Sequence, residues 1–425
     1  MFLVDVYKDF KDFSSKNSIV LSLVYILIFI YPLFILTIRS WSSGIYSILC
    51  LIAIGYLFKK NEYIYPQEVK NYSWIIFLFF ISILISSTLN NWTENSYYRL
   101  GTEAKILAFI PLFLLVFKNS ELRKWFQYSI PLSGVILGCH GVIEVYIFNE
   151  AYSNSSYGRI ITGDIAGLLV GLSGVILIYT KDKTLKNICI AAIVLSSITC
   201  ILSTSRNGYL VLMVNMLFLF FLSYKRSKKS LYLLIIFPVI GGAFATSMID
   251  VKERLNTAVV DFKVYSDVNK RNEVDLTTLS VGFRLEQWRV ALQAFPDQLL
   301  FGAGPGNSGL VINSYIKKGL ADPDLYHPGA STDMVHVHNQ FIDTLLVQGI
   351  IGFVLLLLIL FYPFWIFIKY YKWNEINANM GLILVITYVI SSLTEMPFVS
   401  DNFTSIFFVF MTIFLSNVIE SKRTA

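Results

Sequence analysis

The sequence is poor in charge. Only 15% of its 425 residues are Asp, Glu, Lys or Arg, whereas 55% are apolar and 16% are aromatic. A soluble domain carries about 25% charged residues, so this composition excludes an ordinary soluble protein and indicates a membrane protein. The apolar runs recur from one end of the chain to the other, which favours a single bundle of membrane helices over two or three separate domains.

Cysteine is also scarce. The four cysteines, Cys50, Cys139, Cys189 and Cys200, all lie in apolar runs without paired spacing, which argues against a disulfide framework or a zinc knuckle. Residues 1–17 mix Asp and Lys before the first apolar run, so we expect no cleaved signal peptide and a first run that stays as an anchor. No nucleic-acid partner is inferred from the net charge of +6, because basic residues of a membrane protein first report its orientation.

The apolar runs predict an all-α polytopic membrane protein with about twelve transmembrane helices. Several runs are shorter than the roughly 20 residues of a straight span, so their ends must include polar flanks or pack inside protein. We expect helices 1–9 in residues 1–246, a long periplasmic, partly helical loop with catalytic elements in residues 247–344, and helices 10–12 in residues 345–425. The predicted spans are residues 18–38, 43–58, 74–89, 100–117, 128–148, 160–179, 188–203, 208–224, 231–246, 345–368, 380–393 and 403–419.

Lys and Arg are distributed unequally between alternate loops. One set of loops holds most of the basic residues outside the long loop, and the short loops of the other set hold only Arg39, Arg99, Arg159 and Arg206. The basic side is normally cytoplasmic, so both termini are expected in the cytoplasm. The long loop then lies outside, and its own charge does not weaken this orientation because long loops translocate regardless of charge.

The long loop has the pattern of an ordered segment. Leu285, Trp288, Leu292 and Phe295 recur at helical spacing, and this helix is expected to end before Pro296. The stretch Phe301-Gly-Ala-Gly-Pro-Gly-Asn307 follows, and its glycines allow backbone conformations that are closed to other residues. We therefore expect a loop that is functional rather than disordered.

Two of the four histidines, His336 and His338, stand where the long loop meets the tenth predicted span. Histidine takes or gives a proton readily near neutral pH, and a polar substrate and a lipid could meet here. Arg159, Arg206 and Arg284 are predicted on the same outer face. The planar fork of arginine suits a lipid diphosphate, although a lone arginine in a turn more often pairs with a helix end or snorkels to the interface.

Other constellations have simpler interpretations. His336 and His338 could bind a metal together with His327 and Asp333, and Asp322-Pro-Asp324 could supply paired carboxylates. Both patterns are short and common, and the proline makes the latter a turn first. His140 and Glu144 lie four residues apart in a predicted span, so they share a helix face and are interpreted as a structural pair.

The pattern from His338 resembles a known signature. His338-Asn339, nine further residues, Gly349, two residues and Gly352 resemble the signature of the bacterial O-antigen ligases and of their relatives, the O-antigen polymerases and the O-linked oligosaccharyltransferases. Arg206 with Leu210 resembles the arginine motif of the ligases, and Arg284 in Val-Gly-Phe-Arg-Leu resembles their second arginine.

The resemblance implies a metal-independent and cofactor-free glycosyltransferase in the bacterial inner membrane. It would transfer a finished O-antigen glycan from undecaprenyl diphosphate to a sugar hydroxyl of lipid A-core at the periplasmic face, with inversion at the anomeric carbon. His338 is the candidate general base, a role that contributes roughly 10²–10⁴ in rate. Arg206, Arg284 and Arg159 are candidates to bind the leaving diphosphate. The supporting candidates are Asn339, His336 and Glu395, of which Glu395 could orient a catalytic partner.

Two alternatives remain open at this level. An O-antigen polymerase or a protein O-oligosaccharyltransferase would use the same donor with a different acceptor, although the end at Ala425 leaves no room for the C-terminal region usual in the protein-modifying relatives. A transporter or flippase for a lipid-linked sugar would carry charged or broken helices near the bilayer midplane, whereas the polar candidates here gather at one face.

Overall fold

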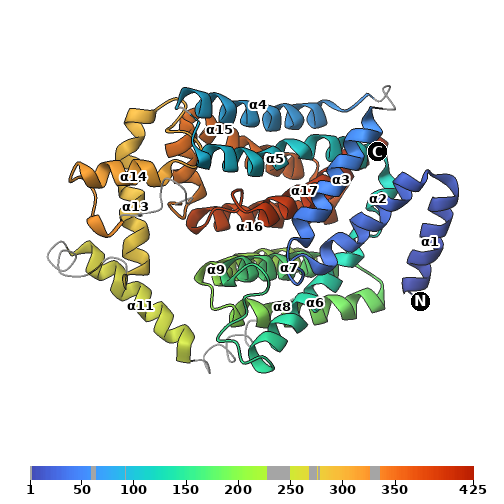
Figure 1. Ribbon diagram of the computed structural model, residues 1–425. Coiled ribbons are helices and arrows are strands. Elements are labelled where there is room, and N and C mark those ends of the chain that lie inside the picture. Colours follow the sequence, from blue (N-terminus) through green and yellow to red (C-terminus); the bar gives the residue numbers. More distant parts are fainter. Residues whose placement is uncertain are drawn as a thin grey trace.

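The computed structural model describes residues 2–58, 64–90, 92–226, 249–267, 275, 278–325 and 336–425, and its regular secondary structure within them consists of helices (Figure 1). Nine helices within these ranges are long and apolar enough to cross a membrane. They are α4 (Gln67–Leu89), α5 (Glu94–Lys118), α6 (Phe126–Tyr146) with the preceding turn η2 (Ser120–Arg123), α7 (Arg159–Tyr179), α8 (Lys183–Leu202), α9 (Arg206–Arg226), α15 (Gln340–Lys369), α16 (Glu375–Thr394) and α17 (Asp401–Thr424).

The multi-pass, all-helical prediction is supported by these elements. Two shorter apolar helices, α2 (Ile19–Ile30), continued by η1 (Tyr31–Phe34), and α3 (Trp41–Leu57), coincide with the first two predicted runs. The predicted span over residues 231–246 lies outside the described residues. The predicted count of twelve therefore stays a prediction.

Several helices begin earlier than the apolar runs predict, because polar residues cap them. The side chain of Thr93 accepts a hydrogen bond from the backbone N–H of Ser96 and starts α5 at Glu94. Asn339 does the same for α15. Such caps satisfy backbone donors that the first turn leaves unpaired, so each apolar run gains a polar turn.

The most deeply buried helices are α7 and α17, in each of which 89% of the most apolar window is buried. Helix α7 packs against α6, α8, α9 and α16. A side chain on Gly208 of α9 would lie 2.8 Å from the backbone of Gly163 of α7, so these two helices meet backbone to backbone. Small residues allow such close approach between membrane helices.

In the described residues between α9 and α15, three helices lie beyond one end of the bundle (Figure 1), and we call this part of the chain the extramembrane segment after its predicted location. The three helices are α11 (Ile249–Ser266), α13 (Ser280–Ala294) and α14 (Ser308–Lys317), with the short turns η4 (Phe295–Gln298) and η5 (Pro323–Leu325). Helix α13 ends before Pro296, as predicted. Its buried face is formed by Val290, Ala291 and Ala294, whereas Leu292 is 49% exposed. Trp288, one of the recurring apolar residues, is partly buried against this cluster, and α13 packs against α14 and α15.

The opposite end of the bundle is tied together by charged and polar pairs. Arg123 pairs with Glu420 at the end of α17, and Lys124 pairs with Asp9 of the amphipathic helix α1 (Phe2–Lys16). The short turn η6 (Tyr371–Trp373) joins α15 to α16 at this end. All the predicted site residues that the structure describes lie at the other end, next to the extramembrane segment.

Candidate active site

Helix α15, which follows His338, is broken. Gly349 has φ 66° and ψ −167°, and this conformation interrupts the helix between Val347 and Ile350. In a continuous helix the carbonyls of Leu346 and Val347 would accept from the N–H groups of Ile350 and Ile351. The break leaves all four groups without their helical partners.

The turn-rich stretch of the extramembrane segment fills this break. Ala303 and Gly304 donate backbone hydrogen bonds to the carbonyls of Leu346 and Val347 at 2.9 and 3.0 Å. The carbonyls of Leu299 and Leu300 accept from Ile350 and Ile351 at 2.9 and 3.4 Å. Four new backbone bonds thus replace two helical ones.

Glycine is required where the two backbones touch. A Cβ on Gly349 would collide with the carbonyl of Leu300, and a Cβ on Gly302 would collide with the backbone of Val347 and Gln348. Both residues also have positive φ, which disfavours any side chain. The glycine of the His-Asn signature therefore has a structural purpose, which is to admit the turn into the helix.

The segment that carries His338 is held from both sides. The indole N–H of Trp288 on α13 donates to the carbonyl of Val337 at 2.7 Å. The side-chain oxygen of Asn339 caps α15, and its NH2 group donates to the carbonyl of Leu393 on α16 at 2.9 Å. His338 itself has φ 50°, an uncommon conformation for a residue with a side chain. The surrounding bonds fix it there.

Glu395 joins His338 to Arg284. One carboxylate oxygen accepts from the Arg284 guanidinium at 3.0 Å, and the other lies 3.5 Å from Nδ1 of His338. The three side chains are partly exposed, at 32% for Arg284, 22% for Glu395 and 40% for His338. They form a charged cluster that a substrate from solvent can reach.

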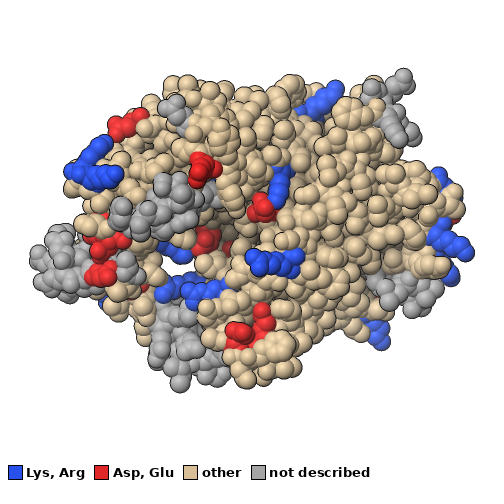
Figure 2. Space-filling model, viewed as in Figure 1, with Lys and Arg blue, Asp and Glu red and all other residues tan. Residues whose placement is uncertain are grey.

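The other two predicted arginines contact residues other than Glu395. Arg206, the first residue of α9, donates to the hydroxyl of Ser280 at 3.4 Å, and Ser280 lies one helical turn before Arg284 on α13. Arg159, the first residue of α7, stacks on the ring of Tyr152 at 5.3 Å, and no direct contact joins it to the cluster in the described residues. Figure 2 shows a hollow between α13 and the ends of α9 and α16, with basic side chains at its edge.

A cavity of about 290 Å³ opens at the cluster. His336, His338 and Glu395 form part of its polar lining, and the first turn of α7 contributes Ile160 and Ile161. The rest of the lining comes from Tyr98, Met396, Pro397, Val399, Ser400 and Phe403. The cavity is thus polar where the histidines lie and apolar toward α7 and α17, which suits a substrate with a charged head and a hydrocarbon chain.

His336 has a different environment from His338. Burial lowers the pKa of His336 to about 3, and the nearby charges of Arg99 and His338 act in the same direction. His336 therefore stays neutral at any physiological pH. It can hydrogen-bond a substrate, but it does not supply positive charge.

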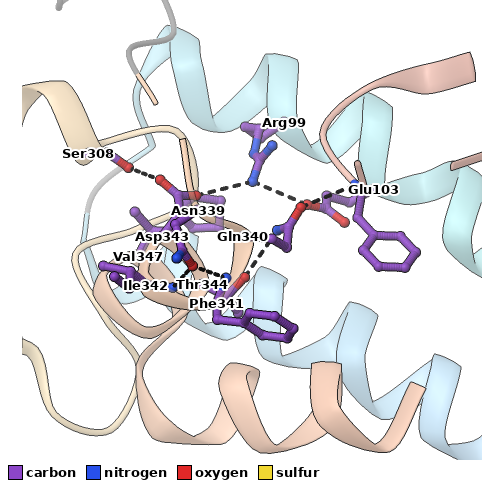
Figure 3. A network of polar contacts seen from close by, with 12 residues as sticks. Arg99, Glu103, Ser308, Asn339, Gln340, Phe341, Ile342, Asp343, Thr344 and Val347 are labelled. Atoms are coloured by element: carbon purple, nitrogen blue, oxygen red, sulfur yellow. Dashed lines mark hydrogen bonds and ion pairs between the residues drawn. The ribbon is translucent and has the colours of Figure 1, made fainter. Parts of the chain in front are cut away.

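A buried ionic network supports the start of α15 (Figure 3). The Arg99 guanidinium, 1% exposed, lies 3.5 Å from Glu103 of its own helix and 3.6 Å from Asp343 of α15. Asp343 also accepts a hydrogen bond from Ser308 of α14. Arg99 thus links α5 to the turn that follows His338. Breaking such a buried group of charges leaves an uncompensated charge, which is strongly destabilising.

The two alternative metal sites considered from the sequence are not formed by the described residues, because no three His, Cys, Asp or Glu side chains converge there. His327 and Asp333 lie outside those residues. Asp322 accepts a hydrogen bond from the backbone N–H of Asp324 at 3.0 Å, so this pair forms a local turn.

The predicted structural pair of His140 and Glu144 is close in space, at 3.5 Å. Glu144 also accepts hydrogen bonds from Ser153 and Ser155, so it stabilises the loop before α7.

The comparisons with known proteins bear on the segment that holds the cluster. Residues 191–357 match the O-antigen ligase family. This match includes Arg206, Arg284, His338, Gly349 and Gly352, and it confirms the resemblance drawn from those residues. It supports glycosyl transfer of the O-antigen ligase or polymerase type. An uncharacterized protein from Haemophilus influenzae is similar at 28% identity over 392 residues, which are 88% of this chain and 94% of the relative.

Glu395 lies beyond the segment that matches the O-antigen ligase family, as do Arg99 and Asp164. Asp164 is fully buried in α7. The sequence points to it only as an acidic residue inside a predicted span, where an ionisable group is costly and is usually functional. Arg99 gives a similar signal at the start of an apolar run. Their partners, Asp343 for Arg99 and Ser391 for Asp164, are distant in sequence, so only the fold reveals the pairs.

Proposed function

We propose that this protein is an O-antigen ligase, which transfers a glycan from undecaprenyl diphosphate to a sugar hydroxyl of lipid A-core. The observation that supports this most directly is the contact of His338 and Arg284 with one carboxylate, Glu395. A base and a phosphate-binding cation at one partly exposed site are the two groups that the reaction needs. The neighbouring cavity is apolar on the side of α7 and α17, where a polyprenyl chain can approach from the membrane.

His338 is the proposed general base. Glu395 lies against Nδ1, and a carboxylate in that position favours the tautomer with its proton on Nδ1. The lone pair of Nε2 then accepts the proton of the acceptor hydroxyl as the oxygen attacks the anomeric carbon. A new C–O bond forms there while the bond to the diphosphate oxygen breaks, so the anomeric configuration inverts.

Arg284 and Arg206 are the proposed donor-binding residues, with Arg159 as a third. The leaving undecaprenyl diphosphate gains negative charge as the glycosidic bond breaks, so cations already in place stabilise the transition state more than the ground state. A guanidinium has five N–H donors, so Arg284 can bind a diphosphate while one of its N–H groups donates to Glu395. Fixed arginines can stabilise this charge without a metal.

We further propose that the site faces the periplasm and that both termini face the cytoplasm. The helix ends opposite His338 carry Lys118, Lys124, Lys183 and Lys369, and the positive-inside rule assigns such an end to the cytoplasm. The donor and the acceptor would then meet on the outer side of the inner membrane.

An O-antigen polymerase is the second candidate, because the match to the family is compatible with either reaction and the same base and arginines would serve a growing glycan as acceptor. A transporter is less well supported. Helix α15 is broken, as in many transporters, but the backbone of residues 299–304 fills the break and leaves no ion site there.

The test is the lipopolysaccharide of a deletion strain in the native host. Loss of a ligase leaves core without any O-chain, while lipid-linked polymer accumulates. Loss of a polymerase instead leaves core capped by one repeat unit, and that result would show that the protein is a polymerase and not a ligase. A His338→Ala protein should insert normally and fail to restore attachment, whereas His140→Ala, which removes the histidine of the structural pair, should restore it. Full attachment by the His338→Ala protein would end the general-base proposal.

A further inference from the structure

Asp164 lies at a junction of three helices that each carry a proposed site residue. It is fully buried in α7, five residues after Arg159. One of its carboxylate oxygens accepts from the NH2 group of Asn207 on α9 at 2.7 Å and from the hydroxyl of Ser391 on α16 at 2.8 Å. The other oxygen is buried and has no hydrogen-bond partner in the described residues.

Both partners are close to proposed site residues along their own helices. Asn207 directly follows Arg206. Ser391 lies one turn before Glu395, whose backbone N–H donates to the Ser391 carbonyl at 2.9 Å. A shift of α9 or α16 at this level would therefore move Arg206 or Glu395 directly, and His338 contacts Glu395.

The packing leaves little freedom around this junction. Gly163 precedes Asp164 and meets Gly208 backbone to backbone, with no room for a side chain on Gly208 between α7 and α9. Asp164 and Asn207 then determine how the two helices are rotated against each other. A buried polar group without its partner costs a large part of its desolvation energy, so this arrangement is favoured over alternatives in which the carboxyl group loses its donors.

We propose that Asp164 is a positioning residue of the transfer reaction, which sets Arg206 and Glu395 relative to each other through its bonds to Asn207 and Ser391. The inference rests on the proposed function. It assigns Asp164 no contact with substrate and no need for a negative charge, because a single oxygen accepts both bonds.

The chain offers a matched control in Asn215, two turns further along α9. Asn215 is fully buried and joins the same three helices, since its NH2 group donates to the carbonyl of Gly167 on α7 at 3.1 Å and to the hydroxyl of Thr387 on α16 at 3.0 Å. Loss of this link should loosen the bundle, while the helix ends at the site stay held by Asp164.

The experiment compares purified full-length variants in glycan transfer from a lipid-diphosphate donor, with thermal stability measured alongside. Asp164→Leu should lower kcat/KM by about tenfold or more, because two hydrogen bonds that set the site are lost. Asp164→Asn keeps an oxygen for both bonds and should stay within about twofold of the wild type. Asn215→Ala should lower Tm but leave kcat/KM within about twofold.

Variants that remove only one of the two hydrogen bonds to Asp164 show what each bond contributes to activity. Asn207→Ala should raise the KM for the donor as well as lower kcat, because it frees the end of α9 with Arg206. Ser391→Ala should mainly lower kcat, because it frees Glu395 beside His338. Equal loss of activity in Asp164→Leu and Asn215→Ala at equal Tm would show a merely structural group, and an inactive Asp164→Asn would show that the charge is used. Either result would overturn the proposal. Absence of transfer by the wild type would count against the proposed function instead.

Discussion

Glu395 is the residue on which the proposed chemistry depends most. It contacts the proposed base and a proposed donor-binding arginine at the same time, so its charge has two effects. In the proposed mechanism it favours a proton on Nδ1 of His338, and it holds the guanidinium of Arg284 next to a carboxylate that lines the cavity. A change at Glu395 should therefore act through both partners.

A Glu395→Gln substitution separates these effects. The amide can still accept from Arg284, but its NH2 group would face Nδ1 of His338 and favour the tautomer with its proton on Nε2, which cannot act as the base. We expect kcat to fall by roughly 10²–10³-fold with a small change in donor affinity. Arg284→Lys keeps the positive charge but loses the two-pronged grip on phosphate in the bound donor and in the transition state, so it should raise the donor KM as well as lower kcat. Equal kinetic profiles for the two variants would contradict the separate roles.

The low pKa of His336 predicts that the folded protein loses stability as the pH falls. Its pKa in the folded protein is about 3, well below the ordinary value near 6.5, so below pH 6.5 the unfolded chain binds a proton that the folded protein does not. Stability contributed by this residue is then present above pH 6.5 and is lost as the pH falls toward 3. A His336→Gln protein should show a smaller fall in Tm between pH 7 and pH 5 than the wild type. Parallel Tm curves would contradict the burial of a neutral imidazole here.

At the scale of elements, the interlock of α15 with residues 299–304 connects the extramembrane segment to the membrane bundle. It consists of backbone groups from both sides, so it depends on shape more than on side-chain chemistry. Asn90 of α4 adds to it, because its NH2 group donates to the carbonyl of Gly302 at 2.8 Å. The turn is thus held between α4 and α15.

Gly349→Ala should disrupt the interlock. The new Cβ would collide with the Leu300 carbonyl in a backbone conformation that alanine disfavours, and the four bonds of the interlock would be lost. We expect a loss of roughly 3–5 kcal/mol in stability together with the loss of transfer. Gly319→Ala is the matched control, because Gly319 also has a positive φ of 70° but nothing within 4 Å, so only backbone strain of roughly 1–2 kcal/mol applies. Equal Tm shifts in the two variants would contradict the interlock.

The sequence predicts local features of these elements better than their contacts. The turn at Phe301–Asn307 and the end of α13 before Pro296 follow from residue types, because glycine and proline restrict or free their own backbone. The insertion of that turn into α15 joins backbones that are more than forty positions apart along the chain, and no residue type encodes it. The spacing of the apolar residues predicts the helix α13 but not which of its faces is buried, because Ala291 and Ala294 are buried by contacts with elements distant in sequence.

At the scale of the whole molecule, the two ends of the bundle differ in chemistry. One end is closed by pairs such as Arg123 with Glu420, and the other holds the cavity and the extramembrane helices. The apolar runs predict most of the bundle because each span needs about 20 apolar residues. The site combines α7, α9, α13, α15 and α16, and their convergence depends on packing that the runs do not contain. The His-Asn signature and the two arginines identify part of the site only through the resemblance.

The orientation of the bundle can be measured directly. We expect a green fluorescent protein fused after Ala425 to be fluorescent and an alkaline phosphatase at the same position to be inactive, because the terminus is proposed to lie in the cytoplasm. The opposite pattern should hold for reporters inserted next to Ala151, in the loop before α7. Phosphatase activity at both positions, or at the terminus alone, would contradict the orientation inferred from the basic residues.

The break at Gly349 also bears on how the protein is made. The part of α15 after the break, from Ile350 to Lys369, is about 30 Å long and can cross the hydrocarbon by itself. The part before it contains Gln340, Asp343 and Gln348 and need not be recognised by the insertion machinery as membrane-spanning. Residues 299–304 leave the ribosome before either part. With the proposed orientation the turn reaches the outer side first, so we expect the short helix next to His338 to form by docking onto this turn after translocation and the site to be completed late in biogenesis.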